Sequence, residues 1–239
     1  MNAMCLRRGV LGGIMLRIGL AMLQGARHEH EEALLASAID LELEIEIVYL
    51  RTAKDVDETI DALVLPGGES TAMRKASTSE GLLDGIYSWM DEFPARPVLG
   101  TCAGAILLAM PDDARTPFIQ TGISRNAWGR QRQSFEAPVV VDLPLHESSN
   151  VKVARTADEF GHTPLAVDGQ TDNSGSALFP GVFIRAPRFE SESVTCDIVA
   201  RFGDEIVGVI DGSKCAVTFH PELTGDRRFH TWLLQQIVN

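Results

Sequence analysis

The spacing of apolar residues in the first half of the chain predicts strands and helices in alternation. Short apolar runs alternate with segments whose apolar residues recur every three or four positions. The predicted strands cover residues 16–23, 41–50, 62–65 and 97–99, and the predicted helices cover residues 28–39, 82–93 and 105–110. Such alternation is typical of a mostly parallel sheet that carries helices on both faces.

The second half of the chain has a different pattern, with short apolar runs separated by turn residues. The predicted strands cover residues 137–143, 182–186, 194–202, 205–211 and 215–219. Residues 144–180 are rich in Ser, Asp, Gly, Asn and Pro and are predicted to be mostly loop, and a helix is predicted at 226–238. We therefore expect a three-layer α/β/α architecture, whose mostly parallel central sheet has an antiparallel extension.

The chain is expected to form one domain over residues 15–239, with 144–180 as a loop insertion. Residues 1–14 are expected to be a disordered extension or the result of a start placed too early. Arg17 interrupts the first apolar run, and no small-residue cleavage site follows it cleanly. No segment is long and apolar enough for a membrane helix, so we expect a cytoplasmic protein without membrane contact.

Charge and cysteine spacing exclude several classes of function. The chain has 33 acidic and 21 basic residues, a net charge of −12, and such a surface repels the phosphates of nucleic acids. The four cysteines are scattered without a C-x-x-C pair, which argues against a zinc site and a disulfide framework. We expect neither a metal nor a cofactor.

The segment Gly100-Thr101-Cys102-Ala103-Gly104 joins a predicted strand to a predicted helix. A G-x-C-x-G sequence at such a junction indicates a nucleophile elbow, because the glycines permit a sharp turn that exposes the central side chain. The start of the following helix favours the thiolate form of Cys102, and the N–H of Ala103 faces a forming oxyanion. The alternative is a buried cysteine in a glycine-rich turn.

A cysteine nucleophile needs a base, and His220 is the strongest candidate among six histidines. It ends a predicted strand, and in an extended segment the side chain of Glu222 points the same way, so the carboxylate can orient the imidazole. His28 and His30 are expected at an exposed helix start, and His230 in the terminal helix. The alternative for His220 is an ordinary surface His-Pro-Glu turn.

The segment Leu65-Pro66-Gly67-Gly68-Glu69-Ser70-Thr71 follows a predicted strand. Its two glycines permit close approach of the backbone to a ligand, and a second oxyanion donor from the Gly68 N–H is its natural role. Ser70 is predicted to cap the helix that follows. The alternative is a plain strand-to-helix loop.

Taken together, these motifs resemble one family. The segments LQGARHEH, LVLPGGEST, LGTCAGAILLA, SRNAWGRQRQSFEA, GVFIRAP and TFHPELTGD, in this order, are similar to the PdxT (SNO) type of glutaminase subunit in pyridoxal 5′-phosphate synthases. The resemblance runs from about Met15 to the C-terminus, apart from residues 144–180. It implies a class I glutamine amidotransferase-like, flavodoxin-like fold.

The resemblance also implies an activity and a set of site residues. Cys102 would attack the side-chain amide of glutamine and form a thioester, while His220 transfers protons and Glu222 orients it. The residues implied in substrate binding are Gly68, Glu69, Ser70, Arg125, Ile184 and Arg185, and the implied oxyanion donors are Gly68 and Ala103. A guanidinium matches a carboxylate with two hydrogen bonds, which independently suits an amino-acid ligand.

Finally, the resemblance implies a partner. The ammonia would pass through a channel to a (β/α)₈-barrel synthase subunit of the PdxS type, and the LQGARHEH region and the oxyanion loop are the candidate interface. Two other interpretations stay open: a triad glutaminase that serves a different synthase, and a non-catalytic regulatory scaffold.

Overall fold

The fold is described from a computed structural model, which describes residues 15–112, 115–125, 134–145 and 178–238. The predicted extension at 1–14 and most of the predicted insertion at 144–180 lie outside these residues. The one-domain interpretation of residues 15–239 therefore stays a prediction.

The first half of the chain builds the parallel part of a nine-stranded sheet. Its strands are β1 (Leu16–Ala21), β2 (Ile45–Leu50), β3 (Ala62–Leu65) and β4 (Val98–Thr101), and β11 (Lys214–Val217) joins them from the end of the chain. Their order is β2-β1-β3-β4-β11, and every neighbouring pair is parallel. The carboxyl ends of β3, β4 and β11 therefore lie along one edge of the sheet, where ligands of open α/β sheets bind.

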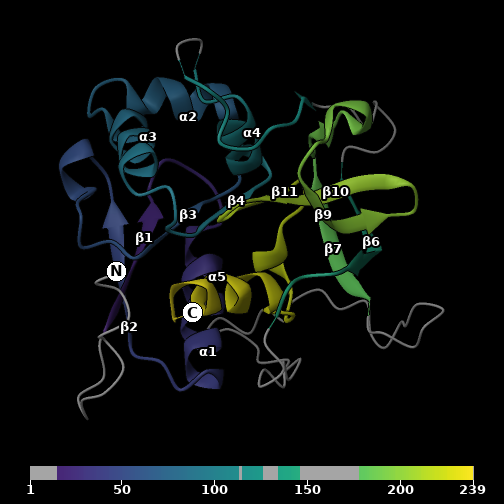
Figure 1. The fold of residues 1–239 in the computed structure, drawn as a ribbon, viewed down its shortest axis with the longest axis horizontal. Coiled ribbons are helices and arrows are strands. Elements are labelled where there is room, and N and C mark those ends of the chain that lie inside the picture. The colour runs from purple at the N-terminus through teal and green to yellow at the C-terminus, as the bar shows by residue number, and fades with distance from the viewer. Residues whose placement is uncertain (1–14, 113–114, 126–133, 146–177, 239) are drawn as a thin grey trace, which may run out of the picture.

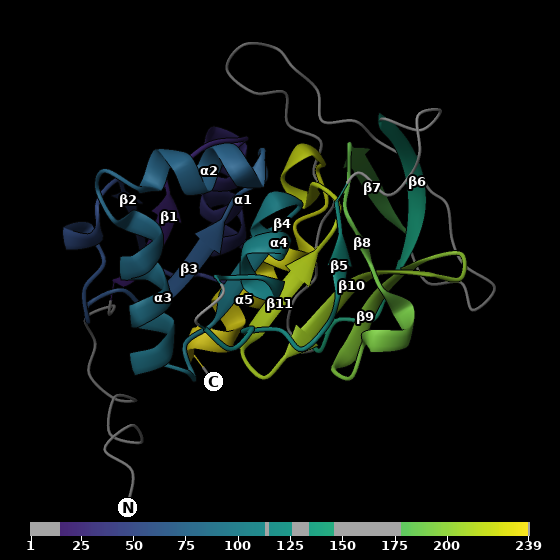
Figure 2. The ribbon, with the colours of Figure 1, turned by 90° about the horizontal axis from the view of Figure 1, so that it is seen from above.

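The second half of the chain extends this sheet with antiparallel strands. These are β10 (Glu205–Asp211), β9 (Asp197–Phe202), β6 (Ser134–Val141) and β7 (Phe179–Ile184), in this order after β11. A small separate ladder pairs β5 (Ile123–Ser124) with β8 (Arg188–Phe189). Figure 2 shows the extension curving away from the parallel half. The predicted division of the sheet into a parallel and an antiparallel part is confirmed.

Helices cover both faces of the parallel half. They are α1 (Arg27–Asp40), α2 (Ser70–Ser77), α3 (Leu82–Glu92), α4 (Ala103–Ala109) and α5 (Arg228–Val238), with short 3₁₀ turns η2 (Ala53–Asp55), η3 (Ser191–Ser193) and η4 (Pro221–Leu223). In Figure 1, α2, α3 and α4 lie on one face and α1 and α5 on the other. The predicted three-layer α/β/α architecture is confirmed.

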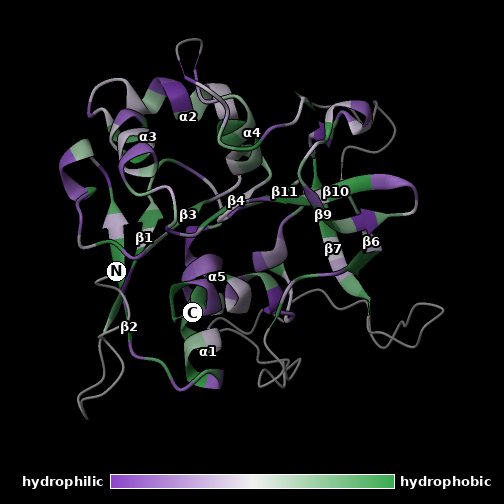
Figure 3. Ribbon diagram, in the orientation of Figure 1, coloured by the Kyte–Doolittle hydropathy of each residue, from purple (hydrophilic) through white to green (hydrophobic). Residues whose placement is uncertain are grey.

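Each face of the sheet has its own hydrophobic core. One cluster gathers apolar side chains of α2, α3 and α4, including Trp89 and Leu107, and the other gathers those of α1 and α5, including Leu34 and Trp232. In Figure 3 most strands are green while much of α2 is purple. Burial of these apolar faces is the main force that holds the helices against the sheet.

Element bounds shift by a few residues from the prediction, as for the strand predicted at 182–186, which is β7 at Phe179–Ile184, and two further differences have a clear physical reason. Strand β2 begins at Ile45, because residues 41–44 form the turn after α1, so the alternation in LELEIEIVYL extends beyond the paired strand. The N-cap of α2 is Glu69 and not Ser70: the Glu69 carboxylate accepts hydrogen bonds from the backbone N–H groups of Thr71 and Ala72, at 2.9 and 2.7 Å. Among the described residues, no helix combines the length and apolar character that a membrane crossing needs.

Candidate active site

Cys102 lies at the turn between β4 and α4, where the predicted passage from strand to helix is present. Its backbone has φ 49°, a left-handed value that a non-glycine residue rarely adopts. The flanking glycines make the turn possible: a Cβ on Gly104 would lie 2.0 Å from the Leu65 carbonyl oxygen, and one on Gly100 would lie 2.9 Å from the Gly104 carbonyl. The close approach of α4 to β3 and β4 thus requires glycine on both sides of Cys102.

His220 follows the end of β11 and faces the same edge of the sheet as Cys102. Cys102 interacts with His220 and helps to raise the pKa of the imidazole, and His220 Nδ1 lies 2.7 Å from Glu222 Oε1. Both His220 and Glu222 are buried, at 7% and 5% exposure. The three side chains therefore form one chain of contacts, in the order Cys102–His220–Glu222, as the sequence predicts.

The contact between His220 and Glu222 shifts both pKa values in the direction of an ion pair. Burial alone lowers the pKa of His220, but its interactions with Cys102 and with the Glu222 carboxylate outweigh burial and raise this pKa to about 10. Burial raises the pKa of Glu222, but the interactions with His30 and His220 outweigh burial and lower this pKa to about 2. His220 is thus held as an imidazolium that a carboxylate orients.

The loop after β3 lies directly against these side chains. A Cβ on Gly67 would lie 2.4 Å from His220 Cε1 and 3.3 Å from Cys102 Cβ, so the backbone at Gly67 passes close to both residues. Gly68 has φ 149°, and the neighbouring N–H of Glu69 donates to Gln24 Oε1 at 2.7 Å. The predicted close backbone approach is present, and the oxyanion role of Gly68 and Ala103 stays a prediction.

Of the predicted substrate-binding residues, Glu69 and Ser70 lie at the start of α2. Ser70 is buried, at 3% exposure. The Glu69 carboxylate is exposed, and the two backbone N–H groups that it accepts lower its pKa. The side chain of Glu69 thus caps α2, while its carbonyl accepts the N–H of Met73 at 2.9 Å, and its role in substrate binding stays a prediction.

The predicted residues Arg125, Ile184 and Arg185 come from distant parts of the chain. Arg125 Nη1 donates to Thr71 Oγ1 at 2.9 Å, which brings its guanidinium to the start of α2. The carbonyl of Ile184, at the end of β7, lies 3.9 Å from Cys102 Sγ. Arg185 follows with φ 44°, a second left-handed non-glycine residue next to the nucleophile. The structure thus brings all three segments to the Cys102 edge, while their role in binding stays a prediction.

Two histidines behind Glu222 were not predicted for the site. His30 is fully buried, which contradicts the expectation of an exposed helix start, and its Nε2 lies 3.4 Å from Glu222 Oε2. His230 Nε2 lies 2.9 Å from His30 Nδ1. The acidic neighbours of His30 in sequence suggested a solvated turn, yet the position of His30 three residues before the buried Ala33 and four before Leu34 placed it on the inner face.

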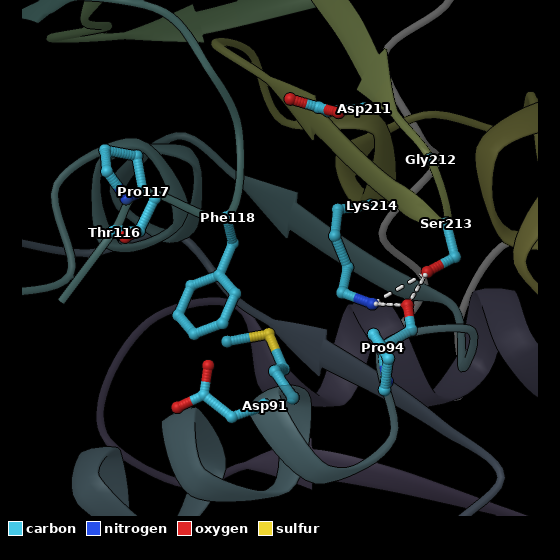
Figure 4. A pocket seen from close by; sticks show the side chains of 10 residues that line it. Asp91, Pro94, Thr116, Pro117, Phe118, Asp211, Gly212, Ser213 and Lys214 are labelled. Atoms are coloured by element: carbon cyan, nitrogen blue, oxygen red, sulfur yellow. Dashed lines mark hydrogen bonds between the residues drawn. The ribbon is translucent and has the colours of Figure 1, made fainter.

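A separate hollow opens at the amino end of β11, at the opposite end of this strand from His220 (Figure 4). The buried Lys214 contributes its ammonium group, which donates to the carbonyl oxygens of Pro94 and Arg96 at 2.7 and 2.9 Å and to Ser213 Oγ at 2.7 Å. These three contacts use all three N–H donors of the group. The ammonium group in this hollow therefore has no N–H left for a ligand, and we do not assign a second catalytic centre there.

Within the described residues, His, Cys, Asp and Glu side chains form no cluster of three or more that could hold a metal ion. The chemistry available at the Cys102 edge is that of a thiol, an imidazolium and a carboxylate. Such a set performs acyl transfer through a covalent thioester.

Comparison with known proteins places this geometry among glutamine amidotransferases. The model of the SNO glutamine amidotransferase family matches residues 20–146 and 142–239. The pyridoxal 5′-phosphate synthase subunit PdxT of Halalkalibacterium halodurans is 34% identical, over 93% of this chain and 95% of its own. That of Thermococcus onnurineus is 35% identical, over 94% of this chain and 100% of its own. A crystal structure of a glutamine amidotransferase is 33% identical and superposes with a TM-score of 0.66, covering 93% of this chain and 99% of its own.

Proposed function

The chain belongs to the SNO glutamine amidotransferase family, and we propose that it is the glutaminase subunit of a pyridoxal 5′-phosphate synthase with a Cys102–His220–Glu222 triad. It hydrolyses L-glutamine to L-glutamate and ammonia. The observation that carries the triad is the left-handed turn at Cys102 beside the buried pair of His220 and Glu222.

The proposed reaction starts with the proton of the Cys102–His220 pair on His220, which is already an imidazolium. The sulfur attacks the side-chain amide carbon of glutamine, and the carbonyl oxygen becomes an oxyanion. His220 then gives the proton to the amide nitrogen, and the C–N bond breaks. Ammonia is released, and the glutamyl group remains bound to Cys102 as a thioester. Water, deprotonated by His220, attacks the thioester carbon and releases glutamate. Glu222 stabilises the imidazolium in both steps.

The oxyanion and the amino-acid group need separate partners. We assign the oxyanion to the backbone N–H groups of Ala103, which follows Cys102 in sequence, and of Gly68, which follows Gly67, whose added Cβ would lie 3.3 Å from Cys102 Cβ. The proposed substrate-binding residues are Gly68, Glu69, Ser70, Arg125, Ile184 and Arg185. Among them, the two guanidinium groups are suited to the α-carboxylate of glutamine.

The proposed partner is a synthase subunit of the PdxS (β/α)₈-barrel type, which receives the ammonia through a channel. Ammonia released into a neutral cytoplasm, the proposed setting, would mostly become ammonium and lose its nucleophilicity. The proposed interface consists of the LQGARHEH segment and the loop around Gly68. The hydrogen bond from Glu69 N–H to Gln24 Oε1 links these two segments and supports a shared surface.

The test is glutamate release from glutamine, with and without the barrel subunit, for the wild type, Cys102→Ala and Cys196→Ala. Loss of the proposed nucleophile is expected to reduce kcat by at least about a thousandfold, whereas Cys196→Ala, outside the site, should keep the wild-type rate. Binding of Cys102→Ala to the barrel subunit is expected to remain intact, as measured by sedimentation.

Substantial activity in Cys102→Ala would contradict the proposed mechanism. A glutaminase that works only with a different synthase would keep the chemistry and reject the pyridoxal 5′-phosphate assignment. If glutamine stayed intact in every mixture while the complex formed, the regulatory scaffold would replace the enzyme as the function.

A further inference from the structure

A pair of buried histidines lies directly behind the carboxylate of the triad. His30 comes from α1 and His230 from α5, and both are fully buried. Their rings are 5.2 Å apart between centroids, and His30 Nδ1 lies 2.9 Å from His230 Nε2. On its other side, His30 Nε2 lies 3.3 Å from Thr101 Oγ1 and 3.4 Å from Glu222 Oε2. The contacts of the triad thus continue beyond Glu222 through two more side chains.

In the part of the chain that the structure describes, the second carboxylate oxygen of Glu222, Oε2, lacks the hydrogen-bond donor that a buried oxygen needs. Oε1 accepts from His220, but Oε2 is buried and has no aligned hydrogen-bond partner within the described residues. A buried carboxylate oxygen without a donor is costly. His30 Nε2, which can carry a proton, lies 3.4 Å from this oxygen. The long contact is of the kind that shortens when a catalytic complex forms.

The hydrogen bond between the two histidines leaves two arrangements of protons. In one, His230 Nε2–H donates to His30 Nδ1, and His30 Nε2–H faces Glu222 and Thr101. In the other, His30 Nδ1–H donates to His230, and a bare lone pair of His30 Nε2 faces the negative Oε2, which is repulsive. The second arrangement would also leave an N–H at His230 Nδ1, an atom without a hydrogen-bond partner among the described residues. The first arrangement is therefore favoured.

From this geometry we propose that His30 is a positioning residue for the glutaminase reaction: its Nε2–H holds Oε2 of Glu222, and His230 fixes the His30 tautomer. The inference rests on the proposed function, because it concerns the same triad. With Oε2 held from behind, the carboxylate cannot rotate away from His220 as the proton moves between His220, Cys102 and the leaving ammonia.

The charges around the pair fit a neutral donor. Burial lowers the pKa of His30 more than Glu222 and Glu29 raise it, and burial, His30 and Arg227 lower the pKa of His230 to about 3. Both rings are therefore neutral at physiological pH. A neutral N–H orients Glu222 without cancelling its charge, so the carboxylate still stabilises the His220 imidazolium.

The direct test is the protonation of the two rings, measured by NMR on the full chain with ¹⁵N-labelled histidine. His30→Gln and His230→Gln spectra assign the signals. We expect the Nε2–H tautomer for His30 and for His230 at pH 7. An Nδ1–H tautomer of His30 would place its lone pair against Glu222 and would overturn the inference, whatever the activity of the protein.

The functional test compares two substitutions of His30. His30→Leu removes the donor, whereas His30→Gln keeps an N–H close to the place of Nε2. In the complex with the barrel subunit, we expect kcat for glutamine to fall about tenfold in His30→Leu, the factor for one hydrogen bond to a charged group, with KM unchanged. His30→Gln is expected to recover most of this loss. A role in packing alone would give no such recovery and would overturn the inference.

A second measurement does not need the partner. Iodoacetamide alkylation of Cys102 in the free chain, followed by mass spectrometry, is expected to slow several-fold in His30→Leu and not in His28→Leu, a control at an exposed histidine of the same helix. Equal rates in wild type and His30→Leu would count against the inference. Should Cys102→Ala and Glu222→Gln keep full activity, the proposed function would fail; should only His30→Leu keep it, the inference alone would fail.

Discussion

A buried basic group lies at each end of strand β11, and the pKa values of the two groups shift in opposite directions. At the amino end, Lys214 donates to backbone carbonyls and a hydroxyl, and burial lowers its pKa to about 8. Just beyond the carboxyl end, His220 contacts Cys102 and the carboxylate of Glu222, which overcome the effect of burial and raise its pKa.

The difference shows that the partner decides what burial does to a charge. Neutral dipoles at the amino end satisfy each N–H of Lys214, but they do not replace the hydration of the ammonium completely. A full negative charge at the other end stabilises the imidazolium itself. The amino end therefore anchors the loop around Pro94, while the carboxyl end keeps a proton ready for transfer.

The largest expected effect comes from removing that negative charge. Glu222→Gln leaves a hydrogen-bonding side chain of the same shape but no carboxylate to stabilise protonated His220. We expect kcat of the complex to fall about a thousandfold, as for other nucleophile–base pairs that lose their orienting carboxylate. Glutamate release measures this loss, and binding of the barrel subunit, followed by sedimentation, serves as the control. A kcat within tenfold of the wild type would remove Glu222 from the triad.

A smaller effect is expected from a methyl group placed against His220. In Gly67→Ala, the new Cβ would lie 2.4 Å from His220 Cε1, so the imidazole must shift from its place beside Cys102 and Glu222. We expect kcat to fall about a hundredfold, because catalysis depends on ångström-scale placement. The matched substitution at the other end of β11 is Gly212→Ala.

Gly212 has φ 58°, and its added Cβ would meet no atom within 4 Å. The strain of a left-handed alanine should cost about 1 kcal/mol in the free energy of unfolding and leave kcat unchanged. Urea unfolding and glutamate release measure both variants. If Gly212→Ala lost as much activity as Gly67→Ala, the two ends of β11 would not differ in function.

The smallest effect is expected at Lys214. In Lys214→Met, relief from burying an ammonium offsets the hydrogen bonds lost by the carbonyls of Pro94 and Arg96, so the free energy of unfolding at pH 7 should change by less than about 1 kcal/mol. The kcat should stay within twofold of the wild type. A large loss of activity in a stably folded variant would contradict the division between the two ends.

The dependence of stability on pH sharpens the same comparison. Between pH 8 and 10.5 the unfolded chain holds a proton on Lys214 that the folded chain has lost, so this group makes stability rise with pH. Between pH 6.5 and 10 the folded chain holds a proton on His220 that the unfolded chain has lost, so His220 makes stability fall with pH. Urea unfolding across this range should show a steeper decline in Lys214→Met and a shallower one in Glu222→Gln.

Much of the fold follows from local patterns in the sequence. The alternation of strands and helices in the first half predicts the parallel sheet, because the period of apolar residues decides which face each element buries. The order β4-β11-β10, which brings the end of the chain next to its middle, has no such signal. It depends on tertiary packing between segments that are distant in sequence.

The site divides in the same way. Cys102 and the spacing of His220 and Glu222 can be recognised because glycines and an extended segment fix their local geometry. The place of Ile184 beside Cys102 depends on how the antiparallel extension folds back. The burial of His30 was missed because the acidic neighbours Glu29, Glu31 and Glu32 indicate solvent, although helical spacing points inward at this one position.

Strand β7 contacts the nucleophile and the base at once. Its Val182 carbonyl accepts the backbone N–H of His220 at 2.8 Å, and its Ile184 carbonyl lies beside Cys102 Sγ. Any local unfolding of β7 therefore separates both side chains from their common support. The fraction of molecules that can catalyse at a given moment is thus limited by the opening equilibrium of one strand, and native-state amide exchange of Phe183 and His220 reports that equilibrium directly.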